Sequence, residues 1–279
     1  MNYRHTYHAG NFADVVKHIA LVAVLAHLRK KEKPFVVIDT HAGRGLYDLE
    51  SEAAAKTGEA ESGIGRLSAL AGAPPPLGAY LALARAFGQR RYPGSPLIAA
   101  AMLRARDRLL AIEKHEEEAG LLARALAPYP RARVVHGDGY ERLIALLPPA
   151  ERRGVVLIDP PYEAPDEFRR LADVFAKAHR RFATAIYLLW FPIKSPGAAD
   201  AFCAEALAGG AAKAMRIDID LGAGKAGHPE RLSAAGLLVV NPPFGLDGDM
   251  TAALGVVAPL LGQGAKPCET RVEWLAGGP

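Results

Sequence analysis

The chain has 279 residues, half of them hydrophobic, and a formal net charge of +4. This length suits one large domain, or one domain with an insertion. No apolar run is long enough to span a bilayer, and residues 1–10 are polar and rich in histidine, unlike a signal peptide. Cys203 and Cys268 stand far apart, without Cys or His partners at metal spacing. We therefore expect a cytoplasmic protein with free thiols, no membrane association and no obligate protein partner.

Basic residues occur in small groups along the chain, such as Arg29-Lys30-Lys31 and Arg180-Arg181, and the sequence pI is about 9.0. Phosphate groups of a nucleic acid would favour such a surface. A net charge as small as +4, however, is better explained by ordinary solvent-exposed helix faces than by a nucleic-acid binding surface. Charge by itself therefore does not identify a nucleic-acid partner.

The first predicted elements are a buried helix and a buried strand. Asn11 is typical of a helix N-cap, Asp14 lies in the first turn, and two apolar rows continue to Lys30 and Lys31. Residues 34–39 predict a strand that ends in a loop with two glycines, Gly43 and Gly45.

The segment 47–106 interrupts the pattern of buried helices and strands. It is rich in alanine and contains three consecutive prolines, at 74–76. Helices are predicted near residues 59–70 and 77–87, and a turn at residues 92–96 leads into a third helix at 97–104. We predict that this segment is a small helical insertion in a main domain formed by residues 1–46 and 107–279.

Strands and helices alternate regularly beyond residue 106. Strands are predicted at residues 109–113, 132–136, 155–158, 185–191, 214–221, 234–240 and 270–274, and helices at residues 115–126, 140–146, 166–179, 198–207 and 247–261. This alternation predicts an α/β fold, a Rossmann-like sheet with helices on both faces.

Polar residues close four successive strands of this sheet: Asp39, Glu113, Asp138 with Gly139, and Asp159. Ligands of such sheets bind at the carboxyl ends of the strands. Glu113 is placed to bind both ribose hydroxyls of a nucleoside. Asp138 would accept a hydrogen bond from an adenine amino group, while the Gly139 amide donates to the ring. Any one of these acids alone would more often be a helix cap, but four together favour one nucleoside site. A dinucleotide site is less favoured, because the full Gly-x-Gly-x-x-Gly pattern is absent.

The motif Asp159-Pro160-Pro161-Tyr162 follows the buried strand at 155–158. The prolines have no N–H to donate, so their carbonyls can accept hydrogen bonds beside a fixed acid and a flat ring. This combination suits a planar amine, held by Asp159 and the Pro160 carbonyl and stacked on Tyr162. A strand end with a rigid turn is the alternative, since short motifs also arise without function.

Two further patterns compete with this interpretation. His5, His8, His18 and His41 allow a metal site, but they lack the spacing of known metal motifs, so we expect no metal. Asn241-Pro242-Pro243-Phe244 resembles a second amino-group motif. It follows a strand late in the chain, whereas the catalytic loop of this fold follows the fourth strand, so we interpret it as a structural turn.

The sequence resembles the RlmJ family nearly from end to end, apart from the insertion and the loop at 222–230. The motifs that carry the resemblance are Tyr3-Arg4-His5, the stretch from His8 to His18, the stretch from Asp39 to Gly45, Tyr92-Pro93-Gly94-Ser95-Pro96, Ile158-Asp159-Pro160-Pro161-Tyr162 and Asn241-Pro242-Pro243. Phe244 stands where tryptophan is expected. These are adenine-N6 methyltransferases of large-subunit ribosomal RNA that use S-adenosylmethionine.

The resemblance implies a class I methyltransferase sheet and assigns residues to the site. The implied cofactor-binding residues are Lys17, His18, His41, Ser95, Glu113, Asp138, Gly139 and Asp159. Asp159 is also the implied catalytic acid, and Tyr3 joins Pro160 and Tyr162 as a substrate contact. The implied partner is ribosomal RNA, before the large subunit is fully assembled. Two alternatives stay open: an adenine-N6 methyltransferase acting on DNA, and a catalytically silent module that binds nucleoside or RNA.

Overall fold

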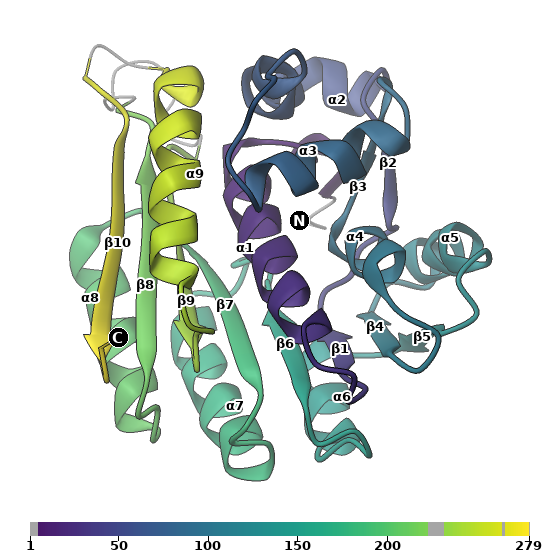
Figure 1. Ribbon diagram of the computed structural model, residues 1–279, viewed down its shortest axis with the longest axis vertical. Helices are drawn as coiled ribbons and strands as arrows, with labels where there is room; N and C mark the ends of the chain where they lie inside the picture. The colour runs from purple at the N-terminus through teal and green to yellow at the C-terminus, as the bar shows by residue number, and fades with distance from the viewer. Residues whose placement is uncertain (1–4, 223–231, 264–265, 279) are drawn as a thin grey trace.

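The computed structural model describes residues 5–222, 232–263 and 266–278. Its centre is an eight-stranded sheet in the order β10-β8-β9-β7-β6-β1-β4-β5 (Figure 1). The strands are β1 (Val36–Asp39), β4 (Arg108–Glu113), β5 (Ala132–His136), β6 (Gly154–Ile158), β7 (Ile186–Pro192), β8 (Ala214–Asp220), β9 (Ala234–Val240) and β10 (Glu269–Ala276). The strands predicted from the sequence all form, with ends shifted by at most two residues.

The sheet is parallel where the predicted site lies. β1 pairs in parallel with β4 on one side and with β6 on the other, and β5 and β7 extend this parallel part. β9 runs antiparallel to both β7 and β8, and β10 runs antiparallel to β8. The chain moves outward from β1 to β4 and β5, and then returns to β6 on the other side of β1. The order therefore reverses between β1 and β6, where sheets of this type open a crevice at their carboxyl edge.

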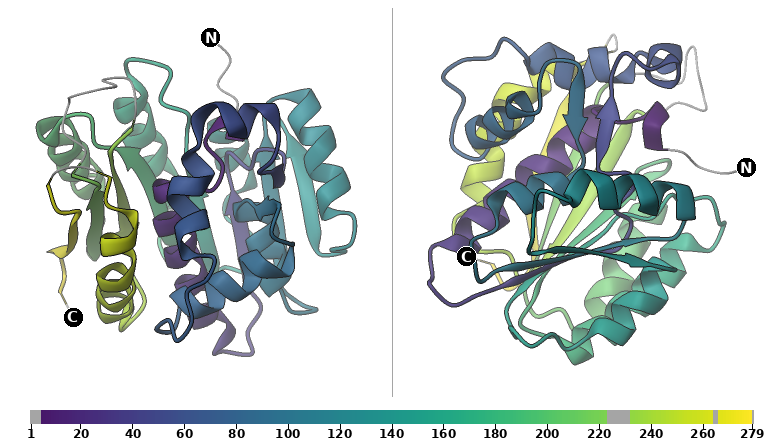
Figure 2. Two further views of the ribbon diagram at one scale, coloured as in Figure 1. Left: turned by 90° about the horizontal axis from the view of Figure 1, so that it is seen from above. Right: turned by 90° about the vertical axis from the view of Figure 1, so that its right-hand side faces the viewer.

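Helices cover both faces of the sheet (Figure 2). One hydrophobic cluster joins α1 (Phe12–Arg29), α3 (Leu77–Ala86), α4 (Ser95–Met102), α5 (Glu116–Leu126) and α9 (Leu246–Leu261) to one face. A second cluster joins α6 (Gly139–Leu146), α7 (Glu167–Arg181) and α8 (Pro196–Ala208) to the other face. These faces confirm the three-layer α/β arrangement predicted from the alternation of strands and helices.

Helix α1 is buried on nearly every side because it packs against the sheet, α4 and α9 at once. Its N-cap is Asn11, as predicted, and the Asn11 side chain accepts a hydrogen bond from the backbone N–H of Asp14. The helix therefore begins at a fixed point next to the carboxyl edge of the sheet. This start places Asp14, Lys17 and His18 at the crevice.

The segment 47–106 contains more than the predicted helices. Two short strands, β2 (Leu46–Asp48) and β3 (Arg91–Pro93), pair antiparallel, and α2 (Glu52–Thr57) precedes a π-helical turn at Glu61–Gly65. β2, β3 and α2 were not predicted from the sequence. Helix α4 ends the segment and contacts α1, β1 and β4 of the main sheet. The division into a main domain and an insertion stays a prediction.

Within the described ranges, none of the helices combines the length and the apolar character needed to cross a bilayer. Most of the predicted glycine-rich loop at 222–230 lies outside the described residues.

Candidate active site

A cavity of about 440 Å³ opens at the carboxyl ends of β1, β4, β5 and β6. Of the residues predicted for the site, all but one line it: Lys17, His18, His41, Ser95, Glu113, Asp138, Gly139, Asp159, Pro160 and Tyr162. Tyr3 lies outside the described residues. The fold thus brings the predicted residues together from several elements and loops that are far apart in the sequence, while their binding roles stay predictions.

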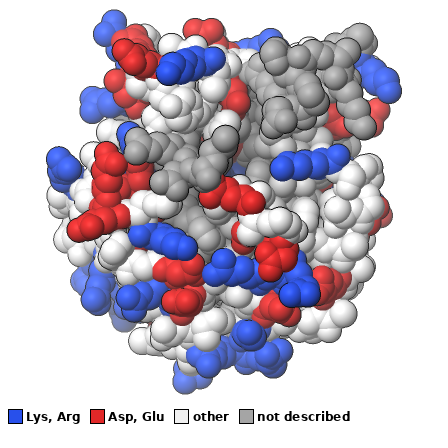
Figure 3. Space-filling view, turned by 180° about the vertical axis from the view of Figure 1, so that it is seen from behind, with Lys and Arg blue, Asp and Glu red and all other residues white. Residues whose placement is uncertain are grey.

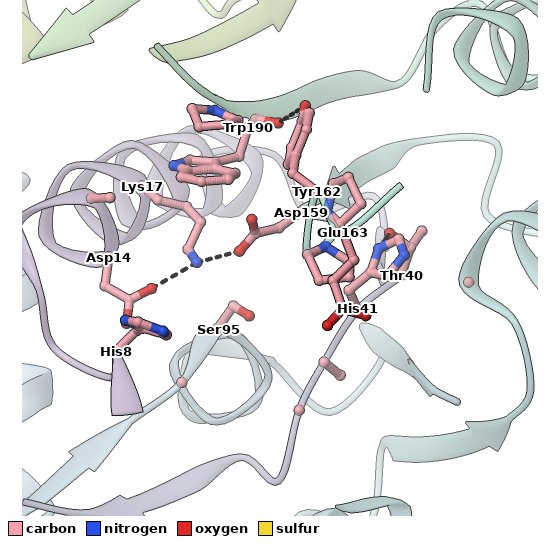
Figure 4. A pocket seen from close by; sticks show the side chains of 18 of the residues that line it. His8, Asp14, Lys17, Thr40, His41, Ser95, Asp159, Tyr162, Glu163 and Trp190 are labelled. Carbon is pink, nitrogen blue, oxygen red and sulfur yellow. Dashed lines mark hydrogen bonds and ion pairs between the residues drawn. The ribbon is translucent and has the colours of Figure 1, made fainter. Parts of the chain in front are cut away.

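Lys17 joins two acids at the centre of the cavity (Figure 4). Its ammonium group donates to Asp14 Oδ1 at 2.7 Å, one helical turn earlier, and forms an ion pair with Asp159 Oδ2. Burial by itself disfavours the charge of Lys17, but Asp14 and Asp159 outweigh this effect and raise its pKa. Lys17 therefore stays an ammonium ion and holds Asp159 in place.

Asp39, at the end of β1, is buried beneath this group. It accepts a hydrogen bond from Ser95 Oγ at 2.6 Å through Oδ2, while Oδ1 has no hydrogen-bond partner among the described residues. Burial raises the pKa of Asp39 to about 6, against the opposing effects of the Ser95 bond and the charge of Lys17. Ser95 is thus tied to β1 by its contact with Asp39.

His41 is held as a neutral acceptor. Burial lowers its pKa to about 4, so the ring is uncharged at neutral pH. Thr40 Oγ1 donates to the carbonyl of Leu157 at 3.0 Å and lies 2.8 Å from His41 Nδ1. Because the Thr40 hydroxyl proton is used, Nδ1 must carry a hydrogen and donate to Thr40. This assignment leaves His41 Nε2 able to accept a hydrogen bond.

Glu113, at the end of β4, shapes the loop that follows β1. Its carboxylate accepts from the backbone N–H of Gly43 at 2.9 Å and of His115 at 2.8 Å. Gly43 has a φ of +62°, in the region that favours glycine. An ionised carboxylate has about four acceptor positions, so Glu113 keeps capacity for the two hydroxyls of a ribose.

Asp138 is the N-cap of α6, accepting from the backbone N–H groups of Tyr140 and Glu141. It also forms ion pairs with Lys114 at 3.4 Å and Arg170 at 3.3 Å. Burial opposes its ionisation, but these amides and cations outweigh that effect and lower its pKa. Asp138 thus has the helix-capping role considered in the sequence analysis, and it lies in the cavity as well.

Two aromatic groups set the remaining walls. His18 Nδ1 lies 2.7 Å from the hydroxyl of Tyr92, and their rings stack at 5.7 Å. Elsewhere in the cavity wall, Tyr162 Oη donates to the carbonyl of Trp190 at 2.8 Å, and the two rings meet at 68° (Figure 4). Tyr162 also has a φ of +52°, uncommon for a residue other than glycine. The ring of Tyr162 is therefore fixed by its own hydroxyl.

Four further residues line the cavity although no site role was predicted for them: Asp14, Thr40, Glu59 and Trp190. Two signals would have identified part of this set. Asp14 lies three residues before Lys17, a spacing that places both on one helix face. Trp190 lies near the carboxyl end of the predicted strand 185–191, at the edge where ligands bind. No comparable local signal marks Glu59.

Asn241 lies at the opposite edge of the sheet. It follows the antiparallel strand β9, so it meets the start of β7, where its side chain donates to the carbonyls of Ala183 at 2.8 Å and Ala185 at 2.7 Å. Its φ of +54° is typical of a turn residue. Asn241 does not line the cavity.

The charges outside the cavity are mixed. On the face in Figure 3, the visible Lys and Arg side chains are interspersed with Asp and Glu. Among the residues that the structure describes, no group of three or more His, Cys, Asp or Glu is arranged to hold a metal ion. The cavity with its buried ionic groups is thus the main candidate for chemistry.

The chain has a Rossmann-like sheet with four polar strand ends around one cavity, and the last of these ends carries the Asp-Pro-Pro-Tyr motif. These features define the chain as an enzyme of the class I methyltransferase type. The family model described as ribosomal RNA large subunit methyltransferase D, RlmJ, matches residues 32–276. The chain belongs to this RlmJ family.

Individual relatives of the chain are consistent with this family. The chain is 39% identical to ribosomal RNA large subunit methyltransferase J of Escherichia coli K12 over 262 residues, 91% of each chain. It is 36% identical to the protein of the same name from Haemophilus influenzae over 260 residues, 91% of this chain and 92% of the relative. A crystal structure of a Legionella pneumophila protein superposes with a TM-score of 0.84 at 30% identity, covering 95% of this chain and 98% of the other.

Proposed function

We propose that this protein transfers a methyl group from S-adenosylmethionine to the N6 amino group of an adenine in large-subunit ribosomal RNA. The observation that carries the proposal is the position of Asp159-Pro160-Pro161-Tyr162 at the switch point of the sheet, with Asp159 paired to Lys17 inside the cavity. The names of the relatives support large-subunit ribosomal RNA as the substrate.

The residues of the cavity fit the proposed cofactor. Asp14 and Asp159 pair with Lys17, and Asp39 lies close enough for the charge of Lys17 to lower its pKa against the effect of burial. Three carboxyl groups near one ammonium group favour a bound cation such as a sulfonium. Glu113 keeps acceptor capacity for ribose hydroxyls, and His41 Nε2, in the loop after β1, and Asp138, after β5, are further acceptors in the cavity wall. We propose that these residues, with Ser95, His18 and Gly139, hold S-adenosylmethionine.

S-adenosylmethionine supplies, when bound, an electrophilic methyl group. The protein's part is to align the adenine amino group, a weak nucleophile whose lone pair is delocalised into the ring. Lys17 engages Asp159 Oδ2, so Asp159 Oδ1 and the Pro160 carbonyl can accept the two N–H bonds of that amino group. These hydrogen bonds favour a more tetrahedral nitrogen. Once the nitrogen carries the methyl group, Asp159 is the nearest group to accept the surplus proton.

Tyr162 provides the surface on which the base would stack, and the bond of its hydroxyl to Trp190 fixes that surface. A base in folded RNA must leave its stack to reach such a pocket. We therefore propose that protein-poor ribosomal RNA, before the subunit is fully assembled, is a better substrate than the mature subunit. Tyr3 is proposed as a further contact to the base.

Substitution of Asp159 tests this proposal. Asp159→Ala removes the acceptor for the amino group, and we expect methyl transfer to fall by roughly 100-fold or more. Lys17 keeps its contact with Asp14, so circular dichroism should stay that of the wild type. Asn241→Ala is the matched control, because it changes the rival Asn-Pro-Pro motif at the far edge of the sheet. Activity retained by Asp159→Ala, or lost only in folded Asn241→Ala, would contradict the proposed role.

A further inference from the structure

Glu59, in the segment 47–106, binds two residues near the amino terminus. Its carboxylate lies 3.0 and 3.1 Å from His8 Nδ1 and accepts from Asn11 Nδ2 at 3.0 Å. The Glu59 side chain is only 14% exposed, and Glu59, His8 and Asn11 all line the cavity. The contact thus lies at the mouth of the cavity and joins residues 48 and 51 positions apart.

Further contacts hold residues 7–11 closely against the segment that contains Glu59. Thr57 Oγ1 donates to the carbonyl of Tyr7 at 2.6 Å, and the N–H of Ile64 donates to the carbonyl of Gly10 at 2.8 Å. A Cβ atom on Gly63 would lie 2.1 Å from the Gly10 carbonyl oxygen. The two backbones therefore touch directly, and residues 7–11, called the amino-terminal segment below, lie against residues 57–64.

The same segment is continuous with the proposed catalytic group. Gly10 N–H donates to Asp14 Oδ2 at 2.9 Å, and Asp14 N–H donates to Asn11 Oδ1 at 2.9 Å. Asp14 in turn accepts from Lys17, which pairs with Asp159. A chain of hydrogen bonds thus leads from Glu59 through Asn11, Asp14 and Lys17 to Asp159.

We propose that Glu59 is a positioning residue for methyl transfer, which fixes the amino-terminal segment at the mouth of the cavity and, through Asn11 and Asp14, the place of Lys17 and Asp159. This inference rests on the proposed function. The hydrogen bond to Glu59, stronger than the opposing effect of burial, raises the pKa of His8. The contact therefore gains charge-assisted strength when His8 is protonated.

The test compares Glu59→Ala with Glu61→Ala. Both remove one carboxylate from the same stretch, but Glu61 is exposed and lies outside the cavity. We expect Glu59→Ala to lower kcat on ribosomal RNA roughly 10- to 100-fold, the effect of a small misplacement of a reacting group. S-adenosylmethionine affinity, measured by titration calorimetry, should fall far less than kcat, because Glu59 does not contact Glu113, Asp138 or Gly139. The melting temperature should stay near wild type. Glu61→Ala should match the wild type throughout.

Glu59→Gln and hydrogen exchange complete the test. The glutamine retains an oxygen that accepts from Asn11 and should recover most of the lost kcat. Amide exchange at residues 7–11 should accelerate in Glu59→Ala alone. Wild-type kcat in Glu59→Ala, or a parallel loss of kcat, cofactor affinity and melting temperature, would overturn the inference. If the wild type itself failed to methylate RNA, the proposed function would fail, and exchange would still decide whether Glu59 holds the segment.

Discussion

Asp39 shows how burial sets the chemistry of a single residue at this site. Its carboxyl group lies under the cavity, with one oxygen bound to Ser95 and the other without a hydrogen-bond partner among the described residues. An ionised carboxylate in such a place loses its hydration without full replacement. For this reason its pKa rises to about 6.

This shift predicts a pH dependence of stability. The native state keeps the Asp39 proton up to about pH 6, whereas the unfolded chain releases it near the ordinary aspartate pKa of 3.8. Stability therefore falls as pH rises through this window, by on the order of 2–3 kcal/mol. Asp39→Asn keeps the contact with Ser95 but cannot ionise. Urea unfolding of both proteins at about pH 4 and about pH 7.5 should show the wild type losing stability relative to the variant. A difference that stays constant with pH would refute this account of Asp39.

At the scale of elements, the site depends on how closely the start of α6 approaches the end of β1. A Cβ atom on Gly139 would lie 2.2 Å from the carbonyl oxygen of Thr40 and 3.0 Å from His41 Cε1. Glycine is therefore required here by a steric contact between two elements. The predicted hydrogen bond from the Gly139 amide to an adenine ring depends on the same approach.

Gly139→Ala should force these elements apart. We expect a loss of about 1–3 kcal/mol of stability and weaker S-adenosylmethionine binding, because His41 and Asp138 move relative to each other. Gly120→Ala, inside α5, is the matched control, since a Cβ there meets no atom within 4 Å. That change should be neutral or stabilise by up to about 1 kcal/mol. Chemical denaturation and titration calorimetry of both variants decide the matter, and equal behaviour of the two would exclude the steric explanation.

At the scale of the whole molecule, the parallel part of the sheet was predictable because its strands are apolar runs that end at polar residues. Val36–Asp39 and Gly154–Ile158 are buried along their full length. Residues of this kind can pack only inside a sheet covered on both faces. The cluster of strand-end acids followed from the same rule, since parallel strands place their carboxyl ends at one edge.

Other features of the fold and the site could not be predicted, because no local sequence pattern marks them. β2 and β3 contain three residues each, too few for an alternating pattern, and β3 ends in a proline that also suits a turn. The partners of Asp39 and Asp159 lie 56 and 142 residues away in the sequence. Such pairings depend on how the elements pack. Neither the Lys17–Asp159 ion pair nor the contacts of Glu59 with His8 and Asn11 could therefore be derived from sequence spacing.

The most direct measurement is nucleoside mass spectrometry of protein-free large-subunit ribosomal RNA after incubation with the purified protein and S-adenosylmethionine. We expect the wild type to form N6-methyladenosine, and Asp159→Ala to form it roughly 100-fold more slowly or not at all. A methyl group on another atom or another base, or methylation of DNA in place of this RNA, would contradict it.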